Sequence, residues 1–367
     1  MEVLNASESG AVERAAGVLR VGGLVGMPTE TVYGLAADAM NGEAVARVFE
    51  AKGRPSFDPL IVHAASAGQA WGVVASEAGW PMGWAADGRA YEAVMGWAER
   101  LAGAFWPGPL TLVLPVREGA VSGLVTAGLG TVGLRVPGHP VARGLIEAAG
   151  VPLAAPSANR FGGISPTQAP HVVDELGGRV GVVLDGGACE RGLESTVVGF
   201  GSADGGLVVE VLRLGSVSVE RLEEAIAGRV RLRVHRGTSR PAGSGAGVES
   251  GAEAPPAPGM LDRHYAPRTP MVLVDRMAEV PGGVDRLAAV CGLEDGKDAG
   301  RWGVFFSVPA GDGREDETVM LSAAAGFFER LRDLDERGYD GIVAVRAPAV
   351  GLGRAINDRL ERGALKA

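Results

Sequence analysis

A segment poor in large apolar residues divides the chain into two unequal parts. From Gly237 to Gly259 the sequence consists mostly of Gly, Ser, Ala, Pro and Glu. Such a stretch buries too little surface to offset the entropy lost on ordering, so it predicts a flexible linker. We therefore expect an N-terminal domain at about 1–236, a linker at 237–269 and a smaller C-terminal domain at 270–367.

Composition supports two folded domains and excludes several classes of protein. Of 367 residues, 46% are hydrophobic and 22% are charged, which is enough apolar material for full cores. No apolar run reaches the ~18 residues that span a bilayer, and Met1–Asn5 lacks the features of a signal peptide, so we expect a cytoplasmic protein without membrane contact. The net charge of −9 argues against a general nucleic-acid coat protein, although a local basic groove is compatible with it. Cys189 and Cys291 are too few for a disulfide framework or a thiolate zinc site.

Strand-like and helix-like patterns alternate along the chain. In the larger part, strands are predicted at 24–27, 60–63, 110–115, 131–136, 151–155, 180–184, 195–198 and 208–212, and helices at 12–20, 45–52, 66–104 and 141–149. Residues 29–33 are expected to be extended. The smaller part predicts strands at 271–274, 303–306 and 341–345, with helices at 322–337 and 353–362. This order predicts an α/β fold, with a mixed sheet followed by a smaller, doubly wound α/β domain.

Common catalytic motifs are absent from the sequence. It contains no Gly-x-x-x-x-Gly-Lys-Ser/Thr loop, no His-Glu-x-x-His helix and no Gly-x-Ser-x-Gly nucleophile. One Gly-x-Gly-x-x-Gly match, at 128–133, runs into the predicted strand 131–136. A dinucleotide site requires a helix at that point, so the match does not predict one.

Polar clusters follow or precede several of the predicted strands. They are Pro28–Leu35, Lys52–Pro55 with Asp58 and His63, Pro156–Asn159 continuing to Ser165, and Glu194–Thr196 with Arg213. Ligands of α/β sheets bind beyond the carboxyl ends of strands, where Ser157 and Asn159 are expected to lie. Lys52, Arg54, Arg135 and Arg213 supply the positive charge that phosphates require.

Each cluster alone also has a structural interpretation. Serine and asparagine after a strand are commonly turn residues, and an arginine beside proline is commonly a solvated loop charge. Arg135 is equally compatible with a structural ion pair, and His63 with a core histidine whose hydrogen bonds are satisfied. The residues by themselves leave these alternatives open.

Taken in order, the clusters resemble a known family. The series PTETVYGL, KGRPxxxPLIVH, FWPGPLTLVL, RVPxHP, APSAN, SPT and ESTVV is similar to the YrdC family, in its long two-domain form of L-threonylcarbamoyladenylate synthase. The resemblance is dense over 10–228 and continues through Pro258–Met260, His264–Pro267 and Gly351–Leu360. It implies a YrdC-like twisted mixed sheet in the N-terminal domain.

The resemblance implies a nucleotidyltransferase that makes threonylcarbamoyl-AMP and pyrophosphate from L-threonine, bicarbonate or CO2, and ATP with Mg2+. The product would pass to a transferase that modifies the tRNA adenosine beside the anticodon. The implied catalytic residues are Lys52 and Arg54. The implied ATP-binding residues are Arg54, Asp58, Thr131, Ser157, Asn159, Ser165, Arg213 and Tyr265. The implied threonine-binding residues are Thr31, His63, Arg135, Ala155 and Ser195. Asp58 stands where the family often has asparagine, and no metal ligands are identified.

Three further expectations concern partners and alternatives. The 237–269 linker, with His264 and Tyr265, is a candidate lid over the active site. Weak binding of double-stranded RNA or tRNA would fit a local basic groove. An RNA-binding or ribosome-assembly module without ATP chemistry, or a carbamoyltransferase, is the alternative function.

Overall fold

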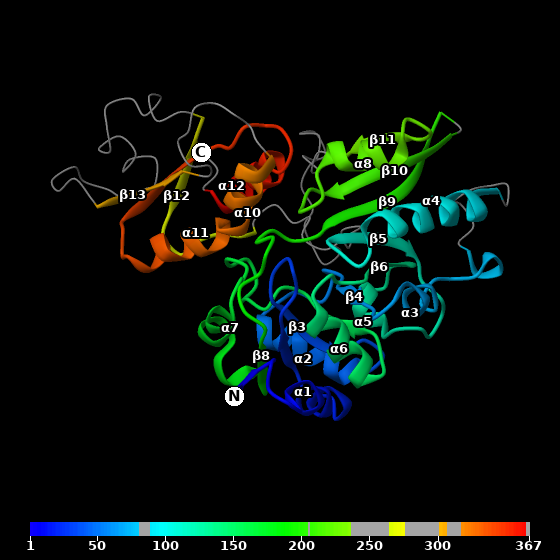
Figure 1. The fold of residues 1–367 in the computed structure, drawn as a ribbon, viewed down its shortest axis with the longest axis horizontal. Coiled ribbons are helices and arrows are strands. Elements are labelled where there is room, and N and C mark those ends of the chain that lie inside the picture. Colours follow the sequence, from blue (N-terminus) through cyan, green and yellow to red (C-terminus); the bar gives the residue numbers. More distant parts are fainter. Residues whose placement is uncertain (81–88, 205, 236–263, 276–300, 307–316, 365–367) are drawn as a thin grey trace, which may run out of the picture.

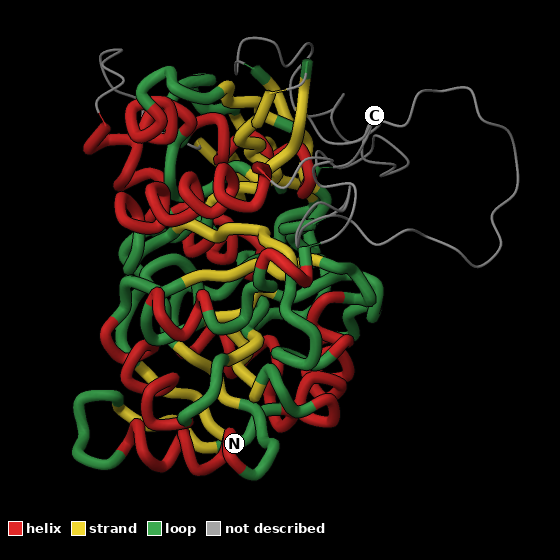
Figure 2. Tube along the Cα trace, turned by 90° about the vertical axis from the view of Figure 1, so that its right-hand side faces the viewer, coloured by secondary structure: helices red, strands yellow, loops and turns green. Residues whose placement is uncertain are grey.

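The chain folds into one large sheet and one small sheet, each covered by helices (Figure 1). The computed structural model describes residues 1–80, 89–204, 206–235, 264–275, 301–306 and 317–364. Most of the predicted linker therefore lies outside the described residues. Figure 2 shows most strands lying between helices, while some strands reach the upper edge of the molecule.

The large sheet has 11 strands in the order β1-β8-β2-β3-β7-β4-β6-β5-β9-β10-β11. Their bounds are β1 (Glu2–Asn5), β2 (Val25–Met27), β3 (Gly34–Asp38), β4 (Ile61–His63), β5 (Leu110–Pro115), β6 (Thr131–Arg135), β7 (Leu153–Ala154), β8 (Val182–Asp185), β9 (Thr196–Ala203), β10 (Gly206–Arg213) and β11 (Arg231–Val234). The sheet contains both parallel pairs, such as β4 with β6, and antiparallel pairs, such as β5 with β6, so the predicted mixed sheet is confirmed.

Helices connect these strands. They are α1 (Ala11–Arg20), α2 (Gly42–Lys52), α3 (Ala67–Trp71), α4 (Arg89–Phe105), α5 (Gly123–Thr126), α6 (Pro140–Ala149), α7 (Ala169–Leu176) and α8 (Val219–Ile226), with short 3-10 turns η1 (Glu77–Gly79) and η2 (Gly177–Arg179). Local signals define the ends of α2. The Asn41 side chain accepts hydrogen bonds from two backbone N–H groups of the first turn, and Gly53 ends the helix with φ of +63°. Lys52 and Arg54 therefore flank a helix terminus.

The register of the central strands determines which side chains share a face. In the β4–β6 pair, His63 lies opposite Arg135 and Val62 lies opposite Leu134. Because side chains alternate along a strand, His63 and Arg135 point to one face and Val62 and Leu134 to the other. The second face is fully buried in the main hydrophobic core, which leaves the first face for polar residues.

A separate three-stranded parallel sheet forms the core of the smaller unit. Its order is β12-β14-β13, with β12 (Met271–Val274), β13 (Trp302–Phe306) and β14 (Gly341–Val345). The helices here are α10 (Glu317–Ala325), α11 (Phe327–Glu336) and α12 (Gly353–Gly363). In Figure 1 this unit lies at the upper left, while β9–β11 lie at the upper right.

Three predictions about local structure were wrong. The predicted helix 66–104 is instead α3, the short turn η1 and α4, and residues 81–88 between them lie outside the described residues. Residues 29–33 are not a strand: the Thr29 hydroxyl accepts hydrogen bonds from the backbone of Thr31 and Val32, which forms a turn. The predicted helix 322–337 is two helices, α10 and α11, which meet at Gly326. The Gly-x-Gly-x-x-Gly match does run into a strand, β6, as expected.

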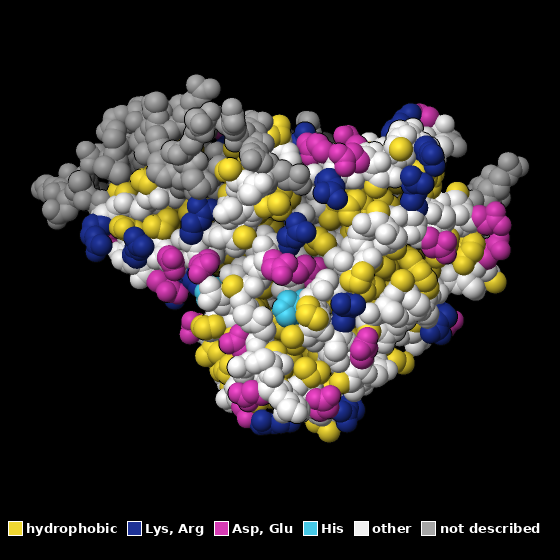
Figure 3. All heavy atoms as spheres, viewed as in Figure 1, with side chains coloured by type: hydrophobic (Ala, Val, Ile, Leu, Met, Phe, Trp, Pro, Cys, Tyr) yellow, Lys and Arg dark blue, Asp and Glu magenta, His cyan; other side chains and the backbone are white. Residues whose placement is uncertain are grey.

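The surface carries charges of both signs. Figure 3 shows Lys and Arg side chains interspersed with Asp and Glu over the described part of one face. This face does not present the continuous basic surface on which nonspecific nucleic-acid binding depends. Within the described ranges, no helix has the length and apolar character needed to cross a bilayer.

Candidate active site

A small cavity beside the central strands collects most of the predicted site residues. Its volume is about 50 Å³. All five residues implied to surround threonine line it, namely Thr31, His63, Arg135, Ala155 and Ser195, together with Arg54, Ser157, Arg213 and Tyr265 from the nucleotide set. The structure therefore brings together residues that are up to 234 positions apart in the chain, from Thr31 to Tyr265.

The cavity lies over a face of the sheet as well as at strand ends. Ile61 and His63 both line it, and residues two apart on a strand point to the same face. Ala155 and Ser157 follow β7, as expected. The prediction of a site beyond strand ends was thus incomplete, because the β4 face forms part of the wall.

Arg135 joins the turn at 29–31 to the sheet. Its Nη2 lies 2.7 Å from Oε1 of Glu30, Nη1 donates to Oγ1 of Thr31 at 2.9 Å, and Nε donates to the carbonyl of Gly108 at 3.2 Å. Burial raises the pKa of Glu30, but the charge and hydrogen bond of Arg135 outweigh that effect and leave the pKa lowered. Arg135 therefore forms the structural ion pair left open above and also lines the cavity.

His63 is buried in the cavity wall. Burial, reinforced by the charge of Arg135, lowers its pKa from 6.5 to about 3. The imidazole is therefore neutral at pH 7. Its Nδ1 makes no hydrogen bond within the described part of the chain, so it is not the satisfied core histidine considered above. An unpartnered ring nitrogen in a cavity wall is available to a polar ligand.

Arg54 and Asp58 form a buried ion pair at one side of the cavity. Nη2 of Arg54 lies 2.9 Å from Oδ2 of Asp58 and 2.8 Å from the carbonyl of Pro59. Burial raises the pKa of Asp58, and the adjacent guanidinium opposes that rise. Arg54 lines the cavity whereas Asp58 does not, so Asp58 orients the guanidinium from behind.

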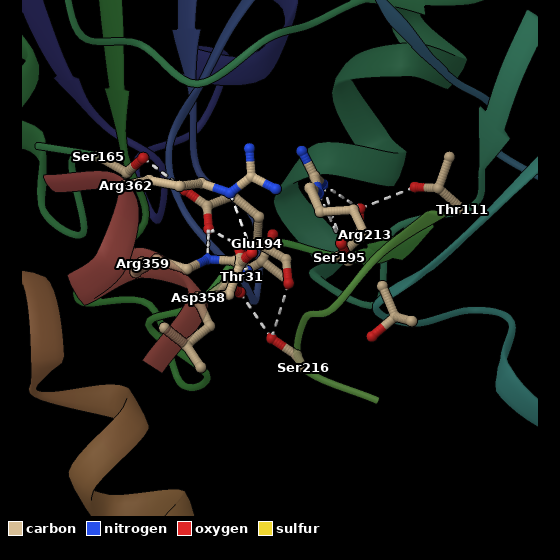
Figure 4. A network of polar contacts seen from close by, with 12 residues as sticks. Thr31, Thr111, Ser165, Glu194, Ser195, Arg213, Ser216, Asp358, Arg359 and Arg362 are labelled. Carbon is tan, nitrogen blue, oxygen red and sulfur yellow. Dashed lines mark hydrogen bonds and ion pairs between the residues drawn. The ribbon is translucent and has the colours of Figure 1, made fainter. Parts of the chain in front are cut away.

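Arg213, the last residue of β10, holds Ser195. Its Nη2 donates to the carbonyl of Ser195 at 2.8 Å and to its hydroxyl at 3.1 Å, and that hydroxyl also bonds Thr111 at 2.7 Å. Figure 4 shows Ser195 between Arg213 and Thr111. The serine hydroxyl is therefore held in one orientation in the cavity wall.

Lys52 and Asn159 support the wall rather than line it. The fully buried ammonium of Lys52 donates to the backbone carbonyls of Ser157 and Asn159. The Asn159 amide in turn donates to the carbonyl of Gly163 at 2.9 Å. Burial, reinforced by Arg54, places the pKa of Lys52 well below its ordinary value. These contacts hold the 157–163 loop, which presents Ser157 to the cavity.

The remaining two predicted residues also lie outside the cavity lining. Thr131 begins β6, opposite Pro115, whereas the cavity lies at the Arg135 end of that strand. The hydroxyl of Ser165 donates to Oε1 of Glu194 at 2.5 Å, so Ser165 reaches the cavity only through Glu194.

Glu194 and Arg359 belong to the site but were not among the predicted site residues, although Glu194 lies in one of the polar clusters. Glu194 lines the cavity, and its Oε2 accepts from Nε and Nη2 of Arg359 at 3.2 and 3.1 Å. Arg359 comes from α12, so the second domain contributes to this network (Figure 4). The sequence pattern of α12 could have indicated Arg359, because this charged residue interrupts the buried stripe formed by Ile356, Leu360 and Gly363.

His264 and Tyr265 cover the cavity where the described chain resumes after the linker. Both are buried and line the cavity. Tyr265 has φ of +63°, in the left-handed region, and its ring packs 5.7 Å from that of Phe328. Burial, with the surrounding cations, places the pKa of His264 well below its ordinary value. The segment therefore closes the site with two uncharged rings.

The described residues do not fit a resident metal ion. They contain no group of three or more His, Cys, Asp or Glu side chains that could hold one. The carboxylates around the cavity, Glu30, Asp58 and Glu194, already pair with arginine. The site is instead cationic, which suits an anionic substrate.

Two family profiles cover nearly the whole chain. The Sua5–YciO–YrdC profile, described as "Telomere recombination", matches residues 17–215, and the profile of the threonylcarbamoyl-AMP synthase C-terminal domain matches 217–364. The threonylcarbamoyl-AMP synthases of Bacillus subtilis and Pyrococcus abyssi are similar, at 38% and 39% identity. These alignments cover 96% and 95% of this chain, and 92% of each relative.

A solved structure agrees with this similarity. The crystal structure of P. abyssi Sua5 complexed with L-threonine is 36% identical, covers 99% of this chain and 97% of its own, and superposes with a TM-score of 0.78. Fold and site thus define a two-domain α/β protein with a buried cationic substrate cavity. The chain belongs to the Sua5–YciO–YrdC family, in its two-domain form.

Proposed function

We propose that this chain is an enzyme that makes threonylcarbamoyl-AMP and pyrophosphate from L-threonine, bicarbonate or CO2, and ATP. One observation carries the proposal: the five implied threonine-binding residues line a single cavity with Arg54 and Arg213. Relatives that align over nearly the full length are named for the same reaction.

The chemistry matches a site without a nucleophilic side chain. The threonine amine and CO2 form a carbamate, whose oxygen attacks the α-phosphorus of ATP. The bond from that phosphorus to the bridging oxygen breaks, and pyrophosphate leaves with the electron pair. Such a transfer depends on positioning and charge neutralisation. Arg54 and Arg213 supply the charge, and the neutral His63 and the hydroxyl of Thr31 orient threonine.

Magnesium enters this proposal as part of the substrate. Because the described residues form no protein cage for a cation, Mg2+ arrives coordinated by ATP oxygens. The chain's own contribution to the polyphosphate is the guanidinium groups of Arg54 and Arg213, which line the cavity.

We also propose that His264 and Tyr265 act as a lid. A cavity of about 50 Å³ is well below the ~300–1,000 Å³ of typical ligand pockets. ATP therefore requires the 264–265 segment to move aside, and its return would retain the unstable product. The proposed recipient is a separate transferase acting on tRNA in the cytoplasm, and weak contact with that RNA stays a prediction.

The test is pyrophosphate release from ATP by the full chain, with L-threonine and bicarbonate each present or omitted. We expect release only when both are present, with a threonine-containing AMP adduct in the mixture. Release with carbamoyl phosphate instead would identify a carbamoyltransferase. No threonine-dependent release, combined with salt-dependent RNA binding, would favour the RNA-binding alternative.

A further inference from the structure

Arg359 brings the second domain to the wall of the active site. Its side chain is fully buried, with two nitrogens on Oε2 of Glu194 and the third on Asp358 at 2.9 Å. Glu194 precedes β9 in the large sheet, 165 residues away in sequence. Figure 4 shows the α12 side chain reaching across to this carboxylate.

The charge of Glu194 needs a partner at this position. Glu194 lines the same cavity as Arg54 and Arg213, which we assign to the polyphosphate of ATP. An uncompensated carboxylate here would repel phosphate and compete for the nearby guanidinium groups. Arg359 neutralises it from outside the cavity, so the charge of Glu194 does not compete with substrate for Arg54 and Arg213.

The same helix also holds the lid segment. The guanidinium of Arg359 lies over the ring of Tyr265, 5.1 Å from its centroid. The backbone N–H of His264 donates to the carbonyl of Arg362 at 3.2 Å. One turn after Arg359, a Cβ at Gly363 would come within 2.9 Å of the Tyr265 carbonyl, so only glycine permits this close approach. Three positions of α12 thus contact the two lid residues.

We propose that Arg359 is a positioning residue of the synthase site, which neutralises Glu194 and holds Tyr265 so that the second domain completes the ATP subsite. This inference rests on the proposed function. A second buried pair between the domains provides a comparison. Arg332 of α11 lies 3.0 Å from Glu175 and donates to the carbonyl of Ile164 at 2.9 Å, and none of these residues lines the cavity.

The first experiment compares Arg359→Met with Arg332→Met in the full chain, using pyrophosphate release. We expect Arg359→Met to raise KM for ATP by about 10-fold or more, because repulsion from Glu194 acts on bound ATP as much as on the transition state. In Arg359→Met, KM for threonine should stay within about twofold of wild type. In Arg332→Met, KM for ATP should also stay within about twofold of wild type. Equal effects of the two substitutions would reduce Arg359 to a general interface residue and overturn the proposal.

A second substitution tests the charge argument. Adding Glu194→Gln to Arg359→Met removes the uncompensated carboxylate, so KM for ATP should fall back towards wild type. Arg359→Lys keeps a positive charge and a folded interface, and should bind ATP better than Arg359→Met. Failure of both changes to recover ATP binding would contradict the neutralising role.

Hydrogen exchange supplies a readout that does not depend on turnover. The backbone amides of peptides covering 264–267 should exchange faster in Arg359→Met than in wild type. In Arg332→Met, their exchange rate should be the same as in wild type. If wild type lacks threonine-dependent turnover, the proposed function fails. The exchange measurement would still show whether Arg359 holds the 264–265 segment. Unchanged exchange in a folded Arg359→Met protein would refute the positioning of Tyr265.

Discussion

The buried cavity and the exposed edge of the large sheet contain ion pairs of the same geometry in opposite environments. Arg135 and Glu30 meet at 2.7 Å with side chains 4% and 8% exposed, whereas Arg231 and Asp204 meet at 2.9 Å with side chains 59% and 80% exposed. Water screens the second pair, and the first has been taken out of water at a large desolvation cost. Distance alone therefore does not indicate what a pair contributes. The ligand proposed for the cavity, rather than stability, accounts for the charges concentrated there.

Removing one member of the cavity pair should give the largest effect. Glu30→Gln leaves the buried charge of Arg135 without its counterion, so we expect the free energy of unfolding at pH 7 to fall by about 3–5 kcal/mol. Urea denaturation measures this. The double variant Glu30→Gln/Arg135→Met removes both charges and should recover part of the loss. A loss below about 1 kcal/mol would mean that breaking the buried pair costs no more than breaking an exposed pair.

Removing a cavity cation should impair catalysis. Arg54→Ala is expected to lower the rate of threonine-dependent pyrophosphate release by about 10²–10³, as when one preorganised charge-stabilising donor is lost. Arg47→Ala, at an exposed position on helix α2, which ends just before Arg54, is the matched control and should stay near the wild-type rate. An unchanged rate in Arg54→Ala would exclude this residue from the site.

The pH dependence of stability should report the buried histidine. His63 has a pKa of about 3 when folded and 6.5 when unfolded, so between these values the unfolded chain binds the extra proton. Unfolding free energy should therefore fall as pH decreases from about 6.5 towards 3, with a slope of up to ~1.4 kcal/mol per pH unit from this group. His63→Gln should remove that share of the slope in urea titrations. An identical slope in the variant would place His63 in contact with solvent.

The exposed pair should give the smallest effect. Arg231→Ala is expected to change unfolding free energy by less than about 1 kcal/mol and to leave turnover unchanged. Urea denaturation at low and high salt, together with the pyrophosphate assay, checks both points. A change comparable with that of Glu30→Gln would remove the distinction between the two environments.

The elements that could be predicted are those with a strong local pattern. The strand at 110–115 was predicted with the bounds of β5, because its apolar run is long and flanked by proline and glycine. β3 was missed, since Gly34–Asp38 has few residues that favour strands and forms only by pairing with β2 and β7.

The same limit applies to the site. Nine of the implied residues line the cavity, because the motifs that contain them are long and ordered. Glu30 and Glu194 were missed as individual site residues, although both lie within quoted motifs. Their roles depend on Arg135 and Arg359, more than 100 residues away, and no local pattern encodes such a partner.

The backbone of Tyr265 shows that its side chain matters more than its turn. Thirteen glycines and four other residues have positive φ among those described, and Tyr265 is the buried one of the four. A left-handed backbone costs a non-glycine residue about 1–2 kcal/mol, and glycine would remove that penalty. The chain nevertheless carries the largest of these side chains there. The folded chain thus carries a standing conformational penalty at the position of a buried aromatic ring, so the contacts of the ring, rather than the turn, account for the tyrosine.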